Sequence, residues 1–415
     1  LYAPFRRGLA WSEFRMVGVD VAFARDDTGW HLTGPDIGAA SSAPRGQLSM
    51  GALGVLVLKD LKLAVDDPQA GLHLTLGASE IRVVNRGATT HLSGRVRNLA
   101  GDPTSIDLIA DVNLNRGNGI FYAGGKDVDL ARFVAQRPFS GLELASGRGD
   151  AQIWIAVESA NIEDVRIRMD LRDATFAAHD PIPLDDGVAV APRTHFDRVA
   201  FVARWLSEEG GWTADVADLV VTRDGGPLPP AGLTLERRGE AGAEHYRAQT
   251  TNLALEPLGS VAMLTSRVPD GDRRWLYLAH PQGQIAGADL RWNDASDFDV
   301  DALLHGAGFA SAGFVPGVEH VDAEVHGDAQ ALLLELDEQM LRVDYPRVFR
   351  KPFLFSKFGG DVVAFRSDDA WRIDTDRLVF EGEGFGGEAR GGIEVQDDRT
   401  KPLLDLYALV THADV

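Results

Sequence analysis

Cysteine is absent from the 415 residues of this chain. Its absence excludes disulfide bonds, metal sites built on thiolates and catalysis by a thiol nucleophile. Long apolar runs are also missing, since no stretch approaches the ~20 residues that a membrane-spanning helix requires. The sequence starts at Leu1 and shows no signal peptide, so we expect a soluble fragment of a longer protein.

Positive charge is scarce, because 41 Lys and Arg face 62 Asp and Glu and the formal net charge is -21. A surface this acidic disfavours nucleic acid, whose phosphates require basic partners. Hydrophobic residues make up 45% of the chain, which is typical of folded proteins and argues against disorder. The chain exceeds the size at which one hydrophobic core keeps growing, so we expect several domains or an extended repeat.

The chain is rich in segments where apolar and polar residues alternate. The stretches "VRIRMDLRD", "DFDVDALLHG" and "HVDAEVHGD" each place apolar side chains on one side and charged side chains on the other. Strict alternation predicts strands with one apolar and one solvated face. Burial on one side only favours an antiparallel sheet over a parallel α/β fold.

Helical periodicity is limited to two short segments, residues 127–137 and 255–266, and Pro138 ends the first of them. Turn-forming clusters such as "TRDGG" and "VPDGD" divide the rest into strands of ordinary length. The sequence therefore predicts a mostly β chain with two or three small helices.

Three similar stretches surround Trp30, Trp212 and Trp371. Each begins with Ser or Thr, then any one residue, then Phe. An alternating run follows and leads to an acidic turn and the Trp. This order predicts a hairpin whose second strand opens on the Trp. A catalytic residue is rarely needed three times in one chain, so we interpret the three Trp residues as packing residues of a degenerate repeat.

Two patterns resemble chemical sites and are better explained by strands. His320, Asp322, Glu324 and His326 alternate along one stretch, but residues on one strand face spread apart, whereas metal ligands converge from several elements. The G-x-G-x-x-G spacing that begins at Gly382 requires a following helix to bind a dinucleotide, and the residues after it alternate instead. We expect no metal, no cofactor and no catalytic residue.

Two short helices cannot cover so many one-sided strands. A sheet that curls into a trough would leave a long apolar lining whose natural occupant is hydrocarbon, at about 0.8 kcal/mol per buried methylene. The alternative is that the same side chains close on each other in a sandwich core. The residues expected to line the groove are Val55, Val57, Val165, Ile167, Met169, Leu171, Phe298, Val300, Val321, Ala323 and Val325.

Several stretches follow one another in an order that resembles the YhdP family of AsmA-like proteins. They are "HPQGQIAGADLRW", "FVPGVEHVDAEVHGD", "LRVDYPRVFRKPFLFSKFGGDVVAF" and "WRIDTDRLVF". The resemblance is collinear over most of the chain and strongest from about Phe196 onward. It implies a bridge-like, repeating β-groove in the periplasm of a Gram-negative bacterium, anchored in the inner membrane by a segment outside this chain. It also implies movement of phospholipid between the inner and outer membranes.

The expected fold is mainly β, an elongated, twisted antiparallel sheet curled into a groove, with a few short helices. We expect three groove segments, residues 1–150, 151–280 with a helix near 255–266, and 281–415. The expected partners are phospholipid acyl chains, the inner membrane and envelope proteins, and no enzymatic activity is expected. Two alternatives stay open, an adhesin-like or scaffolding β-module without lipid transfer and a carbohydrate-active β enzyme with two carboxylates in a cleft.

Overall fold

The structure, a computed structural model, divides into two compact units that are described one at a time. Unit 1 comprises Leu1–Phe139, Glu143–Phe176 and His195–Ser207, and unit 2 comprises Ser140–Leu142, Ala177–Thr194 and Glu208–Val415. Strands predominate in both, which confirms the mainly β fold. The described residues are 13–26, 29–32, 54–67, 72–98, 104–113, 115–133, 140–184, 187–224, 226–240, 242–294, 297–313, 315–367, 370–396 and 403–413.

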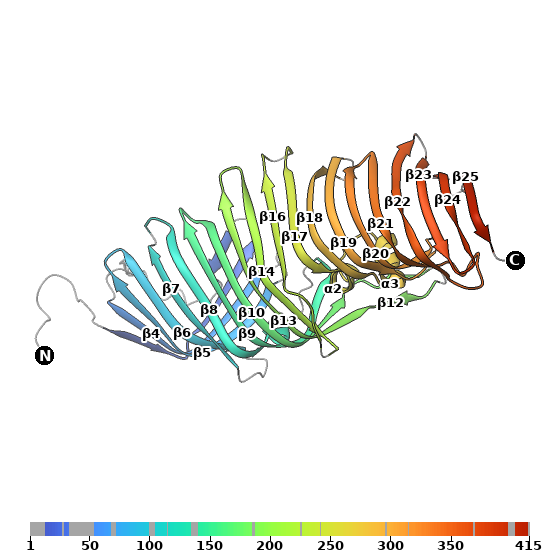
Figure 1. Ribbon diagram of the computed structural model, residues 1–415. Helices are drawn as coiled ribbons and strands as arrows, with labels where there is room; N and C mark the ends of the chain where they lie inside the picture. The colour runs from blue at the N-terminus through green and yellow to red at the C-terminus, as the bar shows by residue number, and fades with distance from the viewer. Residues whose placement is uncertain are drawn as a thin grey trace, which may run out of the picture. The chain divides into compact units, whose positions relative to one another are not determined.

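Unit 1 contains a twisted sheet, coloured blue to green in Figure 1. Its elements are β1 (Phe14–Val17), β2 (Asp20–Asp26), β3 (Gly29–Leu32), β4 (Val55–Asp67), β5 (Leu72–Arg86), β6 (Thr89–Asn98), β7 (Ser105–Asn113), β8 (Asn118–Asp129), α1 (Leu130–Phe133), β9 (Leu142–Glu158), β10 (Asn161–Ala178) and β13 (Arg193–Glu208). From β4 to β9 each strand pairs antiparallel with the next. β1 and β2 pair in parallel with β4, so the sheet is mixed, with antiparallel pairing between most of its neighbouring strands.

Unit 2 contains a second run of long strands, coloured green to red in Figure 1. Its elements are β11 (Ile182–Pro183), β12 (Ala189–Val190), β14 (Gly211–Arg223), β15 (Gly226–Pro227), β16 (Ala231–Arg238), β17 (His245–Ala254), α2 (Leu255–Ala262), α3 (Asp270–Ala279), β18 (Gln282–Asp294), β19 (Asp297–Phe309), β20 (Gly317–Asp328), β21 (Ala331–Asp344), β22 (Phe353–Ser367), β23 (Ala370–Gly382), β24 (Phe385–Gln396) and β25 (Leu403–Ala413). β14 pairs with β16, and from β16 to β25 each strand pairs antiparallel with its successor.

Irregular residues interrupt many of these strands. Asp127, Asp218 and Gly306 have positive φ values of 51°, 52° and 54°. Each lies at a register shift between paired strands. Asp tolerates the left-handed region because its short side chain bonds locally, and Gly has no Cβ to clash there. Such bulges bend a strand and increase its twist, so they favour a curled sheet over a flat one.

The helices only partly match the expected ones. α2 begins at Leu255, where the predicted segment 255–266 begins, but the predicted segment 127–137 is strand up to Asp129 and helical only over α1, with residues 134–137 outside the described part. α3 was not predicted, because its start lies in "VPDGD", which was interpreted as a turn. Asp270 and Asp272 lie in its first turn, where carboxylates stabilise the helix dipole, and the left-handed His280 ends it.

The strand pairing tests the hairpins predicted at the three Trp residues. Each Trp of the repeat is the second residue of a strand: Trp30 of β3 pairs with Arg25, Trp371 of β23 pairs with Arg366, and Trp212 follows the first residue of β14. The hairpin interpretation is therefore confirmed for the pairs at Trp30 and Trp371.

The division into three groove segments stays a prediction. Within the described part, no helix is long and apolar enough to cross a membrane.

Candidate functional site

One face of the unit 2 sheet carries an unbroken apolar row, which we call the central row. Directly paired residues of neighbouring strands point to the same face, so the strand registers define it. It crosses eleven strands from β14 to β25, and no member is polar or charged. Its members are Ala214, Leu235, Ala248, Leu290, Val300, Gly327, Leu332, Ala364, Ile373, Ile393 and Leu404.

A second row lies two residues along each strand on the same face and contains one polar residue, Thr250. Its members are Val216, Leu233, Thr250, Ala288, Ala302, Val325, Leu334 and Val362. Side chains two residues apart in a strand share a face, so the two rows together form a continuous apolar surface. We call this surface the apolar face of unit 2.

Aromatic rings gather at one end of the apolar face, in what we call the phenylalanine cluster. Phe380 pairs with Gly387, which shares its face of β24 with Ile393 of the central row. Ring centroids in the cluster lie 4.6–6.5 Å apart. The cluster consists of Phe349, Phe353, Phe355, Phe358, Phe380 and Phe385. The sequence reasoning did not single it out, although "VFRKPFLFSKF" contains four of its six rings.

In the part of the chain that the structure describes, no second sheet covers the apolar face. Leu290, Val300 and Leu332 are half-buried, and Ile373 and Leu404 are 37% and 66% exposed. The inner faces of a β-sandwich interdigitate at core density, so their large side chains would be fully buried. Among the described residues, no member of the central or second row is buried. The face is therefore open to a ligand.

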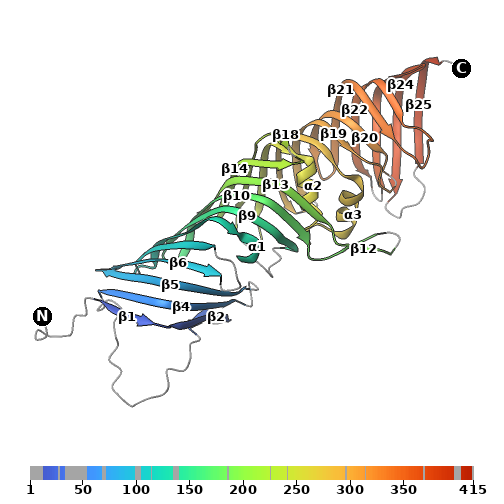
Figure 2. The same ribbon diagram turned by 90° about the horizontal axis from the view of Figure 1, so that it is seen from below.

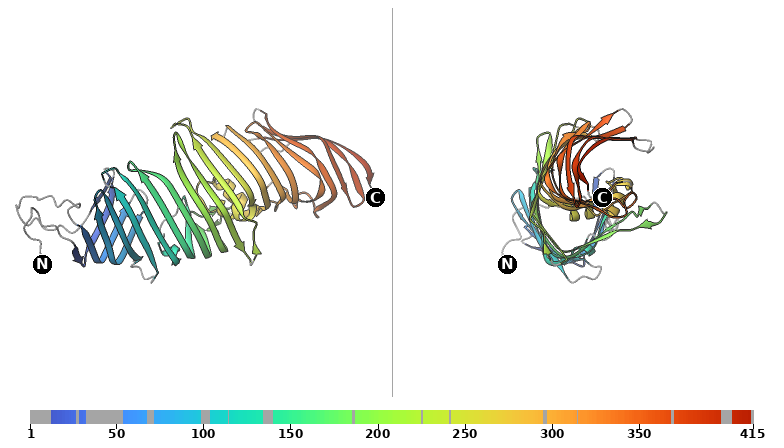
Figure 3. Two further views of the ribbon diagram at one scale, coloured as in Figure 1. Left: turned by 60° about the vertical axis from the view of Figure 1, so that its left-hand side comes forward. Right: turned by 45° about the vertical axis from the view of Figure 1, so that its right-hand side comes forward.

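The apolar face lies on the inner side of the curl of unit 2. Trp275 of α3 packs edge-on against Phe309 at a centroid distance of 5.5 Å. Phe309 pairs with Val318, Val318 with Val343, and Val343 with Phe353 of the phenylalanine cluster. Directly paired residues share a face, so the side of the sheet that α3 contacts is the side that bears the apolar face. Figure 3 shows the strands of unit 2 curling around the side on which α2 and α3 lie, and Figure 2 shows both helices beside β18 and β19.

Unit 1 has an apolar face of its own, formed by two rows across β4 to β9. Part of this face is closed, because Ile81 and Val83 are 5% and 7% exposed and belong to a packed core cluster. Phe121 of β8, next to last in the first row, is 39% exposed. The rows are Leu56, Val83, Leu92, Ala110, Phe121 and Ile155, and Leu58, Ile81, Gly94, Leu108, Ala123 and Ile153.

Five of the predicted lining residues lie on the apolar face of unit 2. Val300 belongs to the central row and Val325 to the second row. Phe298 shares its face of β19 with Val300, and Val321 and Ala323 share theirs of β20 with Val325. Ala323 is only 4% exposed, whereas the other four are half-buried.

Four further predicted residues alternate along β10. Asp170 accepts a hydrogen bond of 2.8 Å from Arg198 of β13, and the residues on either side of it point the other way. Leu171 lies against Gly149, because a Cβ added there would be 2.9 Å from the Leu171 Cα. Gly149 shares its face of β9 with Ile153. The residues placed on the apolar face of unit 1 are Val165, Ile167, Met169 and Leu171, of which Leu171 is buried.

The last two predicted residues, Val55 and Val57, lie on the other face of β4. They alternate with Leu56 and Leu58, which pair with Val83 and Ile81 in the apolar rows. Val57 is 2% exposed. Because β4 begins "VLVL", both faces are apolar there and alternation cannot decide between them. Their contact with lipid stays a prediction, and the proposal below rests on the other nine residues.

The opposite face of the unit 2 sheet is charged and dense with ion pairs. The Nε of Arg247 donates to Oδ1 of Asp289 at 2.9 Å, and the Arg291 guanidinium lies 3.3 Å from Asp289 Oδ2. The hydrogen bond from Arg247 holds the pKa of Asp289 below its usual range and outweighs burial, which raises this pKa. This face suits water, so the two faces of one sheet differ sharply in polarity.

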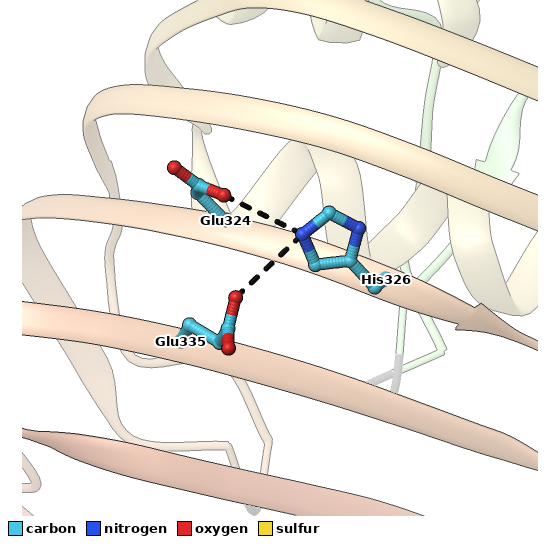
Figure 4. Close-up of side chains that lie close together, drawn as sticks. All are labelled: Glu324, His326 and Glu335. Atoms are coloured by element: carbon cyan, nitrogen blue, oxygen red, sulfur yellow. Dashed lines mark ion pairs between the residues drawn. The ribbon is translucent and has the colours of Figure 1, made fainter.

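His326 and two carboxylates form the densest cluster of metal-ligand types on the charged face (Figure 4). His326 Nε2 lies 3.5 Å from Glu324 and 3.7 Å from Glu335, and their ligand atoms fall within 4.8 Å of one another. His326 Nδ1 is 2.8 Å from Asp301. A metal site would use carboxylates and a neutral imidazole, but here the ring is surrounded by three carboxylates that stabilise the imidazolium. Ion pairing accounts for the arrangement.

We expect Asp301→Asn to bring the pKa of His326 back toward its ordinary value. The hydrogen bond with Asp301 is the largest cause that raises this pKa. Because the folded pKa is raised, the ion pair stabilises the fold below the ordinary His pKa, and this contribution is lost as pH rises through the folded pKa. An NMR titration of His326 measures the shift. Asp337→Asn on β21 is the control, and an equal shift in the control would contradict the assignment.

The chain is similar in sequence to known proteins. A profile of the YhdP family, described as YhdP protein, matches residues 6–415. The chain belongs to the YhdP family. It is similar to the intermembrane phospholipid transporter YhdP of Escherichia coli (strain K12), with 18% identity over 309 residues. The match covers 72% of this chain and 23% of that relative, so the chain spans about a quarter of the relative's length. No solved structure matches the chain.

Proposed function

We propose that this chain is a periplasmic segment of an inner-membrane-anchored protein and that it carries phospholipid between the inner and outer membranes along its apolar face. The observation that carries this proposal is the central row, an unbroken apolar path over eleven strands that no second sheet covers. Membership of the YhdP family supports it, as does the name of the Escherichia coli relative.

An acyl chain is the ligand that suits such a face. The half-buried side chains of the central row can still lose exposed apolar area, and each methylene laid against them contributes about 0.8 kcal/mol. Such contacts are non-directional, so no particular polar side chain is required. The charged opposite face keeps the segment in water, while the headgroup of the lipid stays at the open side of the curl.

The alternative, a scaffolding β-module without lipid transfer, requires a different cover for the apolar face. The described residues supply little, since α2 packs chiefly against β17 and β18, and α3 contributes the contact of Trp275 with Phe309 of β19. Uncovered apolar surface of this extent is costly in a protein that holds no ligand. The phospholipid proposal accounts for the surface directly, with the inner membrane and envelope proteins as its further partners.

Native mass spectrometry with lipid extraction tests the proposal on the purified chain. We expect phospholipid to accompany the wild type and to be reduced in the Ile167→Asp/Met169→Asp variant, whose charges would lie on the apolar face of unit 1 while the apolar face of unit 2 is unchanged. Arg166→Asp/Arg168→Asp is the matched control, because it changes the same strand on its other side. Circular dichroism must show unchanged β structure in both variants.

Two outcomes would contradict the proposal. One is a well-folded wild type that carries no phospholipid and takes up none when it is added. The other is equal loss of lipid from both variants. Either result would favour the scaffolding module, in which the apolar faces close on protein.

A further inference from the structure

The connection between β21 and β22, residues 345–352, concentrates positive charge, and we call it the basic loop. It reads YPRVFRKP, with three cations, Arg347, Arg350 and Lys351, and no carboxylate. All three side chains are exposed. In a chain with a formal net charge of -21, this composition is unusual.

Apolar side chains project from the same loop. Val348 and Phe349 are 61% and 42% exposed, and Leu354, just beyond the loop, is 65% exposed. The backbone N–H groups of Val348 and Phe349 both donate to the Tyr345 carbonyl, at 2.9 and 2.8 Å. The turn therefore presents cations and apolar side chains together at one edge of unit 2.

Two cations of the basic loop, Arg350 and Lys351, differ from those on the charged face of the sheet. There, Lys357 lies 2.8 Å from Glu338 and Arg377 lies 2.6 Å from Glu388. Arg350 and Lys351 form no ion pair with any residue in the part of the chain that the structure describes. Their charge is available to an anionic partner.

The basic loop is continuous with the apolar face. Phe349 packs edge-on against Phe353 at a centroid distance of 4.6 Å. Phe353 in turn lies 6.1 Å from Phe355 and 6.3 Å from Phe385, inside the phenylalanine cluster. A hydrocarbon chain could pass from the loop onto the central row without crossing a charged side chain.

We propose that the basic loop docks on the surface of a bilayer that contains anionic phospholipid. Val348, Phe349 and Leu354 enter the acyl region, Arg350 and Lys351 contact lipid phosphates, and lipid passes over the phenylalanine cluster to the apolar face. The last of these steps rests on the proposed lipid transport, whereas docking itself does not.

Charge complementarity favours this partner. Basic residues are attracted to an anionic bilayer surface, and apolar side chains beside them gain by entering the headgroup boundary. The rest of this acidic chain is repelled by the same surface, so the basic loop would decide which part makes contact. The long stems of Arg and Lys allow the charge to stay at the phosphates while Phe349 and Leu354 lie deeper.

Co-sedimentation with vesicles tests the docking. Vesicles of phosphatidylglycerol and phosphatidylethanolamine should bind the wild-type chain, and vesicles of phosphatidylcholine alone should bind it much more weakly. We expect Arg350→Glu/Lys351→Glu to reduce binding about tenfold or more, and Val348→Asp/Phe349→Asp to reduce it similarly. Arg291→Glu/Arg377→Glu makes the same change in net charge on the charged face and should bind like the wild type.

Lipid uptake, measured on the same proteins, separates docking from transport. Arg350→Glu/Lys351→Glu should still acquire phospholipid presented in detergent, because its apolar face is intact. Docking without any lipid uptake would overturn the proposed transport and leave the docking in place. Docking is overturned if the wild type does not bind anionic vesicles or if the control variant loses binding equally. It is also overturned if the loop variants change only self-association, measured by analytical ultracentrifugation.

Discussion

Leu332→Asp is expected to lower phospholipid uptake by the chain about tenfold or more, whereas Leu333→Asp leaves uptake unchanged. Leu332 belongs to the central row, where it pairs with Gly327 and Ala364. Losing one Leu from an apolar contact costs about 1.5–3 kcal/mol, and a carboxylate there adds the cost of its desolvation. Every 1.4 kcal/mol corresponds to a factor of ten in affinity.

Leu333 is a closely matched control. It is adjacent in β21, has the same side chain and is also half-buried, but it pairs with His326 and Val363 on the charged face. Uptake of a fluorescent phospholipid from vesicles gives the comparison, with circular dichroism to confirm the sheet. Equal uptake by the two variants would mean that the central row does not contact lipid, whatever the wild type binds.

Arg273→Met is expected to destabilise the helical part of unit 2 by about 3–4 kcal/mol. Arg273 of α3 is 2% exposed, and it donates to the carbonyls of Met263 and Asp180 at 2.9 and 2.7 Å and to Asp270 at 3.0 Å. Removing it leaves two main-chain acceptors without their donor, at about 1–3 kcal/mol each. Met fills similar volume, so the lost hydrogen bonds account for most of the effect.

Hydrogen exchange measured by mass spectrometry follows this loss in α2, α3 and the β11–β12 hairpin. A local readout is preferable because a chain of two units need not unfold in one step. Arg291→Ala is the control, since that side chain is 56% exposed and exposed ion pairs contribute about 1 kcal/mol or less. If exchange around α3 rises no more than exchange around β18 in the control, Arg273 does not hold the helices in place.

Alternation in the sequence predicted the faces of strands wherever the two faces differ in polarity. The β10 stretch separates Val165 and Ile167 from Arg166 and Arg168, and the structure separates them in the same way. Alternation cannot predict which face Val55 and Val57 occupy, because their neighbours are also apolar. α3 was missed for a related reason. The Gly between its two first-turn carboxylates resembled a turn, and packing against Phe309 outweighs that local preference.

Strand register could not be predicted from periodicity. The central row exists only because eleven strands pair in one particular alignment, and bulges at residues such as Asp218 and Gly306 reset that alignment within strands. A one-residue slip would move each apolar side chain to the charged face. The basic loop was visible in the sequence as a charge pattern, but its continuity with the phenylalanine cluster depends on the packing of Phe349 on Phe353.

The absence of polar and charged side chains from the central row affects how fast a lipid would move along it in the proposed transport. Neighbouring strands lie about 4.8 Å apart, so eleven strands span roughly 50 Å, which exceeds the ~30 Å hydrocarbon core of a whole bilayer. In the proposed transport, an acyl chain would therefore cover only part of the row, and each step would exchange one apolar contact for another. For the proposed transport, this composition predicts a free-energy profile along the row without barriers from polar or charged side chains. Net flux would then follow the difference in lipid supply between the two ends.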